Sequence, residues 1–99
     1  MAATFIIGTT GRIGDADDAS CRLRGYSLSE LQVLHGSRLV PTAERRAVAV
    51  SLDRMWRGEV ERRSGWLLRK DRTVVFVDVT AHGSTSEELT LVVEPEFRR

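Results

Sequence analysis

The sequence has very few of the residues that build cross-links and metal sites. Its 99 residues include one cysteine, Cys21, and two histidines, His35 and His82. A single cysteine excludes an intrachain disulfide and a thiolate metal cage, and it is typical of a reducing compartment. Neither histidine has a second histidine or a cysteine at metal-ligand spacing. We therefore predict no metal site, and we interpret Cys21 as a buried apolar thiol.

Long apolar runs and an excess of either charge are also missing. The amino-terminal run Phe5 to Ile7 is far too short for a signal sequence or a membrane span. Fifteen basic and fourteen acidic residues leave a net charge of +1, so no overall field directs the chain to nucleic acid or to an anionic membrane. The sequence predicts one globular domain over residues 1–99, cytoplasmic and without a membrane partner.

The clearest local signal is a helix start. Ser27 and Glu30 have the spacing of a capping box, in which each side chain binds the other residue's backbone amide. This predicts a helix that begins at Leu28 and stops near His35, where Gly36 can adopt the left-handed conformation.

A second helix is predicted over residues 42–57, after Pro41. Its apolar residues recur at helical spacing and form one stripe. They are Val48, Leu52, Met55 and Trp56. Gly58 favours an end near Arg57, but Gly65 is an alternative end, so the sequence leaves residues 58–65 open between helix and strand.

The remaining segments read as strands, because they are rich in β-branched and aromatic residues between turn signals. Strands are expected at 4–9, 66–69, 73–80 and 88–94, with a short edge strand at 21–24 and a polar loop at 81–87. The expected order β-(β)-α-α-β-β-β predicts an α+β two-layer sandwich, in which two helices pack on one face of an antiparallel or mixed sheet of three to five strands.

One face of this sheet has a surplus of apolar residues. Val74 and Phe76 point away from the side on which Val75, Val77 and Val79 lie, and Val92 joins them from the last strand. Two helices cover only one face, so this patch is either an interface or is covered by the glycine-rich loop or by Phe97.

Residues 5–14, with glycines at 8, 11 and 14, are similar to the first strand and glycine turn of extended short-chain dehydrogenases, where the backbone approaches a dinucleotide. In that family the turn opens a helix that faces the pyrophosphate. Here three aspartates follow, at positions 15, 17 and 18, and their charge would repel a phosphate. We predict no cofactor.

A catalytic site is not predicted either. Asp78, His82 and Ser84 lie close together along one strand and loop, and such residues rarely converge into a triad.

These observations predict a small non-enzymatic protein-protein interaction module, an adaptor or inhibitor-type regulator of bacterial or phage type, which associates with itself through the sheet. Its partner is expected to be another copy or another protein. The alternative is a winged-helix-like nucleic-acid-binding regulator, in which the arginine face of helix 42–57, Arg46, Arg54 and Arg57, contacts phosphates. That face also carries Asp53, which favours a salt-bridged solvent face instead.

Overall fold

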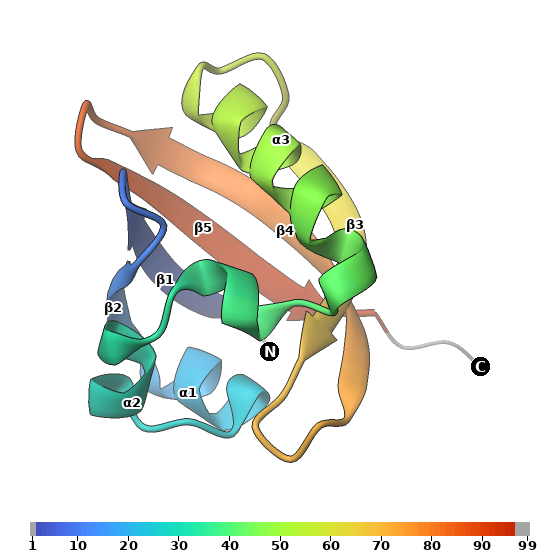
Figure 1. Ribbon diagram of the computed structural model, residues 1–99. Coiled ribbons are helices and arrows are strands. Elements are labelled where there is room, and N and C mark those ends of the chain that lie inside the picture. The colour runs from blue at the N-terminus through green and yellow to red at the C-terminus, as the bar shows by residue number, and fades with distance from the viewer. Residues whose placement is uncertain (1, 97–99) are drawn as a thin grey trace.

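The computed structural model describes residues 2–96. Within this part of the chain five strands form one antiparallel sheet, and the helices lie on a single face of it (Figure 1). In chain order the elements are β1 (Ala3–Gly8), β2 (Ile13–Ala16), α1 (Asp18–Arg24), α2 (Leu28–Val33), the 3-10 helices η1 (Gly36–Leu39) and η2 (Thr42–Glu44), α3 (Arg45–Trp56), β3 (Arg62–Leu68), β4 (Val74–Ser84) and β5 (Glu88–Pro95). The predicted two-layer α+β architecture is confirmed.

The strand order explains why the helices share one face. Neighbouring strands run β2-β1-β5-β4-β3, so β2 and β3 stand at opposite edges of the sheet. The chain between Ala16 and Arg62 must cross the whole sheet, and it carries all the helical segments over one face. We call this the inner face and the opposite one the outer face. No helix in residues 2–96 is long and apolar enough to cross a membrane.

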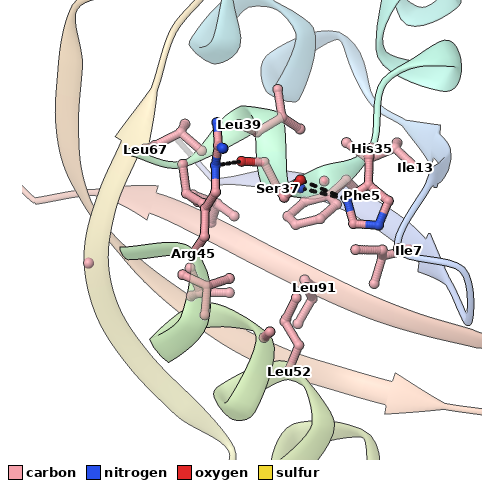
Figure 2. Close-up of a pocket in the computed structure, with 18 of the residues that line it drawn as sticks. Phe5, Ile7, Ile13, His35, Ser37, Leu39, Arg45, Leu52, Leu67 and Leu91 are labelled. Carbon is pink, nitrogen blue, oxygen red and sulfur yellow. Dashed lines mark hydrogen bonds between the residues drawn. The ribbon is translucent and has the colours of Figure 1, made fainter. Parts of the chain in front are cut away.

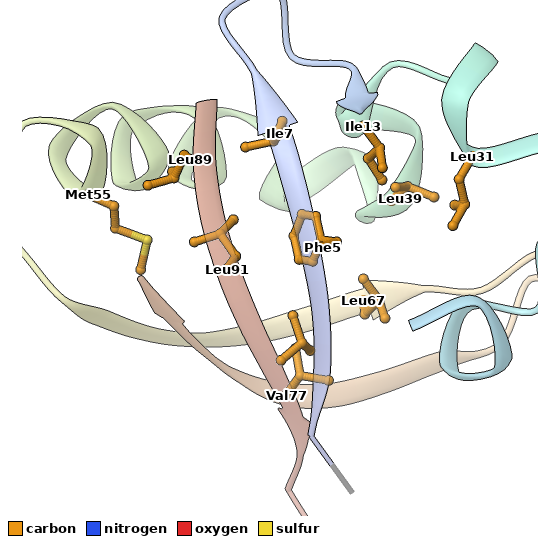
Figure 3. Packing of buried hydrophobic residues seen from close by; sticks show 11 residues of the cluster. Phe5, Ile7, Ile13, Leu31, Leu39, Met55, Leu67, Val77, Leu89 and Leu91 are labelled. Atoms are coloured by element: carbon orange, nitrogen blue, oxygen red, sulfur yellow. The ribbon is translucent and has the colours of Figure 1, made fainter. Parts of the chain in front are cut away.

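The core lies between the inner face and the helices (Figure 3). Alternate residues of each strand point inward, as the two-residue period of a strand requires. Phe5 and Ile7 of β1 and Leu89 and Leu91 of β5 are buried in this way. From the helices, Leu31, Leu39 and Met55 pack against them. Met55 belongs to the stripe that the sequence predicts for α3, and Leu52 and Trp56 also pack on this core.

The predicted capping box is present. The Ser27 hydroxyl accepts the Glu30 amide at 3.2 Å, and the Glu30 carboxylate accepts the Ser27 amide at 2.9 Å. The helix begins at Leu28, as predicted, but it ends at Val33, and Gly36 begins η1 without adopting the left-handed conformation. The second carboxylate oxygen of Glu30 accepts a hydrogen bond from Lys70 Nζ at 2.6 Å, which attaches α2 to the β3–β4 hairpin.

The predicted edge strand at 21–24 is wrong, because this segment belongs to helix α1. The Asp17 carboxylate caps the helix: one oxygen accepts the Ser20 amide at 2.8 Å, and the other accepts the Thr4 amide of β1 at 3.1 Å. Gly25 ends the helix with φ 79°. Two alternations of apolar and charged residues were too short to distinguish a strand from one side of a helix.

Two further segments differ from the sequence prediction, and the structure also resolves the segment that the sequence left open. Residues 13–16, interpreted as loop, form β2, because β1 supplies the hydrogen-bond partners. The predicted loop 81–87 begins later, since β4 continues to Ser84 past a bulge between Ala81 and Gly83. In the open segment 58–65, Gly58 (φ 74°) follows the end of α3, and β3 begins at Arg62.

Candidate functional site

A cavity of about 370 Å³ lies between α3, η1 and the inner face of the sheet (Figure 2). Most protein interiors contain few voids larger than a water molecule, whereas sites for small molecules begin at about 300 Å³. Its walls are mainly apolar. Leu52 points from α3 toward Leu91 of β5, and Phe5 and Ile7 form the wall on β1 (Figure 2).

Several small residues line this cavity. Gly65 takes an inward position on β3, between Arg63 and Leu67, and the Arg63 side chain lies over it. Gly8, Gly36 and Ala49 line other parts of the cavity.

Two polar groups on the cavity wall are held in place by η1. Arg45 Nε donates to the Ser37 carbonyl at 2.8 Å, so the arginine at the start of α3 is attached to the segment opposite it (Figure 2). Nδ1 of His35 lies 2.9 Å from the Ser37 hydroxyl and accepts the Ser37 amide at 3.1 Å. The imidazole packs against Gly11, where a Cβ atom would lie 2.8 Å from its Cε1 atom.

Arg63 contributes a third polar group from the sheet. Its Nη1 donates to the Ser51 hydroxyl of α3 at 3.2 Å, and its Nη2 lies 3.9 Å from the Glu44 carboxylate. The guanidinium also covers Gly65, where a Cβ atom would lie 3.0 Å from Nη2. Arg63 therefore connects β3 to the helical layer beside the cavity.

The sequence prediction did not include this cavity or its arginines. Arg24 and Arg45 carry no local motif, and Arg63 fell in the segment left open between helix and strand. The single signal available was Gly65 within a strand, since a glycine there often marks a close approach or a missing side chain.

The predicted interface residues share the outer face, but Val92 stands opposite Thr80, four residues along β4 from Phe76. Val74 and Phe76 belong to β4, and Val92 belongs to β5. Trp66 of β3 joins them: its ring meets the Phe76 ring edge-on with centroids 5.0 Å apart. Trp66 is 45% exposed and Val74 49% exposed. The alternative that Phe97 covers this face lies outside the described residues.

The arginines of the nucleic-acid alternative are exposed on α3 but are mostly paired. Arg57 contacts Asp53 at 2.8 Å and Glu59 at 3.2 Å, and Arg54 contacts Glu59 at 3.6 Å. The predicted Asp53 to Arg57 pair is confirmed. Arg46 is exposed on the same helix. A winged-helix arrangement is not what the chain forms, because α3 lies across the inner face of a five-stranded sheet.

The residues of the rejected catalytic and cofactor motifs do not converge. Asp78 accepts a hydrogen bond from Ser64, which lowers the pKa of its carboxyl, and Ser84 bonds the Trp56 carbonyl at 3.3 Å. The glycine turn joins the antiparallel strands β1 and β2 and does not open a helix. Cys21, expected to be buried, is only partly buried, and this burial raises the pKa of its thiol.

Residues 2–96 contain no cluster of three or more groups able to hold a metal ion.

Comparison with known proteins identifies the fold. No family model matches the sequence, and no curated protein matches it. The structure, however, superimposes on solved PAS domains. The PAS domain of a Desulfitobacterium hafniense protein matches with a TM-score of 0.84 and 20% identity, over 95% of this chain and 92% of that one.

Two further solved structures match similarly. A domain of a sensory box sensor histidine kinase/response regulator from Geobacter sulfurreducens has a TM-score of 0.81 and 22% identity, over 94% of this chain and 82% of that one. The PAS domain of the Cronobacter turicensis quorum-sensing receptor RpfR, in complex with C12:0, has a TM-score of 0.80 and 14% identity, over 95% of this chain and 92% of that one. The chain therefore has the PAS fold, a five-stranded antiparallel sheet with helices on one face.

Proposed function

We propose that this chain is a sensor domain without catalytic activity, which binds a small, largely apolar molecule in the cavity and acts on another protein through its outer face. The cavity is the observation that carries the proposal. Its volume of about 370 Å³ lies in the range of small-molecule sites, and its apolar walls suit an apolar ligand. The likeness to a receptor domain in complex with C12:0 supports the same type of ligand.

A binding experiment with one obstructing substitution tests this proposal. Leu52 points into the cavity (Figure 2), so Leu52→Trp places a large ring system in the space that the ligand would occupy. Val50 lies two residues earlier on α3 and is 55% exposed, so Val50→Trp is the matched control.

The probe is N-phenyl-1-naphthylamine, a neutral dye whose fluorescence rises in apolar surroundings. The wild type and Val50→Trp are expected to bind it alike, and Leu52→Trp is expected to bind it about tenfold or more weakly. Circular dichroism checks that both variants are folded. Absence of dye binding to the wild type, or equal binding to Leu52→Trp, would contradict the proposal.

For the action on another protein, the predicted partner is a second copy of this chain, which meets the outer face with its own. The patch formed by Trp66, Val74 and Phe76 supports this assignment. No helix of the described chain lies over it, and Trp66 and Val74 keep about half of their surface in solvent. In a two-fold dimer each copy presents the same patch to the other, so apolar residues meet apolar residues.

The charges beside the patch are compatible with such a dimer. Arg62 and Asp78 lie on the same face and contact each other at 3.4 Å within one copy. A second copy therefore does not have to supply a counter-charge for either residue. The association is accordingly expected to depend little on salt.

A further inference from the structure

Arg24 is the most deeply buried charged residue that lines the cavity. It is the last residue of α1, and only 2% of its surface is exposed. Its backbone carbonyl accepts the Lys70 amide at 3.0 Å, and its guanidinium carbon lies 4.4 Å from the centre of the Phe5 ring. The side chain is thus held between helix and sheet at the part of the cavity where Phe5 forms the wall.

The polar contacts of Arg24 leave most of its hydrogen-bonding capacity unused. Nε donates to the Ser20 hydroxyl at 3.3 Å. Within residues 2–96 no carboxylate forms an ion pair with Arg24, and its two terminal nitrogens have no acceptor. Burial lowers the pKa of Arg24 to about 10, so the side chain still carries its charge at neutral pH.

A buried guanidinium without an anion is unusual, because transfer of a charge from water costs several kcal/mol unless it is paired. The face of Phe5 offsets part of this cost. No acidic side chain within the described residues offsets the remaining cost of burying the Arg24 charge. Binding of an anion from outside the chain would therefore lower the free energy.

The other charges at the cavity point to the same conclusion. Its charged lining residues are Arg24, Arg45, Arg63 and Asp53. The one carboxylate, Asp53, already pairs with Arg57 at 2.8 Å. Arg63 in turn lies 3.9 Å from the Glu44 carboxylate. The positive balance of this largely apolar lining therefore rests on Arg24 and Arg45.

We propose that the ligand of this cavity is an apolar monocarboxylic acid, whose carboxylate binds the two terminal nitrogens of Arg24 while its apolar part lies along Phe5, Ile7 and Leu91. The inference rests on the proposed small-molecule function. A carboxylate has two oxygens that match the planar fork of one guanidinium. One unpaired fork in an apolar cavity suits a single negative charge better than a phosphate, which needs more donors.

The test compares acids with alcohols of the same length. A series from hexanoic to dodecanoic acid, and the corresponding primary alcohols, competes with N-phenyl-1-naphthylamine for the full chain at pH 7.5. The best acid is expected to displace the dye at a concentration about 10- to 100-fold lower than its alcohol, because only the acid forms charged hydrogen bonds.

Two variants test whether Arg24 causes the preference for acids over alcohols. Arg24→Gln is expected to bind the acid and the alcohol alike. Arg22→Gln, an exposed neighbour on the same helix, is expected to keep the wild-type preference. If Arg24→Gln does not fold, Arg24→Lys keeps the charge but loses the fork, and a reduced preference for the acid is expected.

The outcomes separate the two proposals. Alcohols that bind the wild type as tightly as acids, or a preference that survives in Arg24→Gln, would overturn the carboxylate inference and leave the apolar site in place. Tighter binding of an alkyl phosphate than of the acid would also overturn it. A wild-type protein that binds neither dye, acid nor alcohol would overturn both.

Discussion

Replacing Trp66 with alanine tests whether the outer face is a contact between two copies. The tryptophan is 45% exposed. A tryptophan side chain buries up to about 250 Å², so about 110 Å² is left for a partner to cover. At about 25 cal/mol per Å², this is about 3 kcal/mol per copy as an upper limit.

A two-fold dimer contains this residue twice. Trp66→Ala should therefore weaken association by at most about 5 to 6 kcal/mol, or about 10⁴-fold in the dissociation constant, and by about 100-fold if half of the contribution is realised. The substitution also removes the contact with the Phe76 ring. Edge-on pairs contribute about 0.5 to 1.5 kcal/mol, so the variant should also unfold more easily.

The assay is sedimentation equilibrium over a wide range of protein concentration, at low and at high salt, below the unfolding temperature of both proteins. The wild type is expected to be a dimer that high salt does not dissociate, and Trp66→Ala a monomer. Val33→Ser, at a valine that is 70% exposed on α2, controls for the loss of any exposed apolar residue and should remain dimeric. A wild type that is monomeric at all concentrations would refute the reasoning, as would a Trp66→Ala dimer of unchanged affinity.

Two further predictions concern the attachment of the helical layer. Asp17→Ala should lower the free energy of unfolding by about 1 to 2 kcal/mol in urea titrations, because it removes a helix cap that also binds β1, whereas Asp18→Ala, in the first turn, should change it by only a few tenths. The hydrogen bond from Lys70, with that from the Ser27 amide, lowers the pKa of Glu30 from 4.5 to about 2. Because the folded pKa is the lower one, this pair stabilises the fold above pH 4.5 and loses its effect between pH 4.5 and 2. Lys70→Met should raise the Glu30 pKa toward 4.5 in an NMR titration, and an unchanged pKa would contradict the assignment.

The sequence by itself determined the features that depend on neighbouring residues. Ser27 and Glu30 satisfy each other's amides within one turn, so the start of α2 could be predicted to the residue. The apolar period of α3 was predictable for the same reason, whereas its end stayed open in the sequence between Arg57 and Gly65. Alternation along β4 and β5 also placed Val74 and Val92 on the face that has no helices.

Tertiary structure decided the elements that need a distant partner. Residues 13–16 contain a glycine and an aspartate, which have low strand propensity, and they form β2 only because β1 lies beside them. Helix α1 is capped by Asp17, whose second carboxylate oxygen accepts the amide of Thr4. The sequence of residues 21–24 gives no sign of the hydrogen bond between Asp17 and Thr4.

The cavity could not be predicted, because its volume depends on how far apart the helices and strands pack and not on the sequence of any one element. It exists where α3 and η1 cross strands that lie far away in the sequence. Arg24 looks in the sequence like one more surface arginine. The fold buries it against Phe5 and brings no carboxylate from residues 2–96 to it, because burial is set by what packs around a side chain and not by its sequence neighbours.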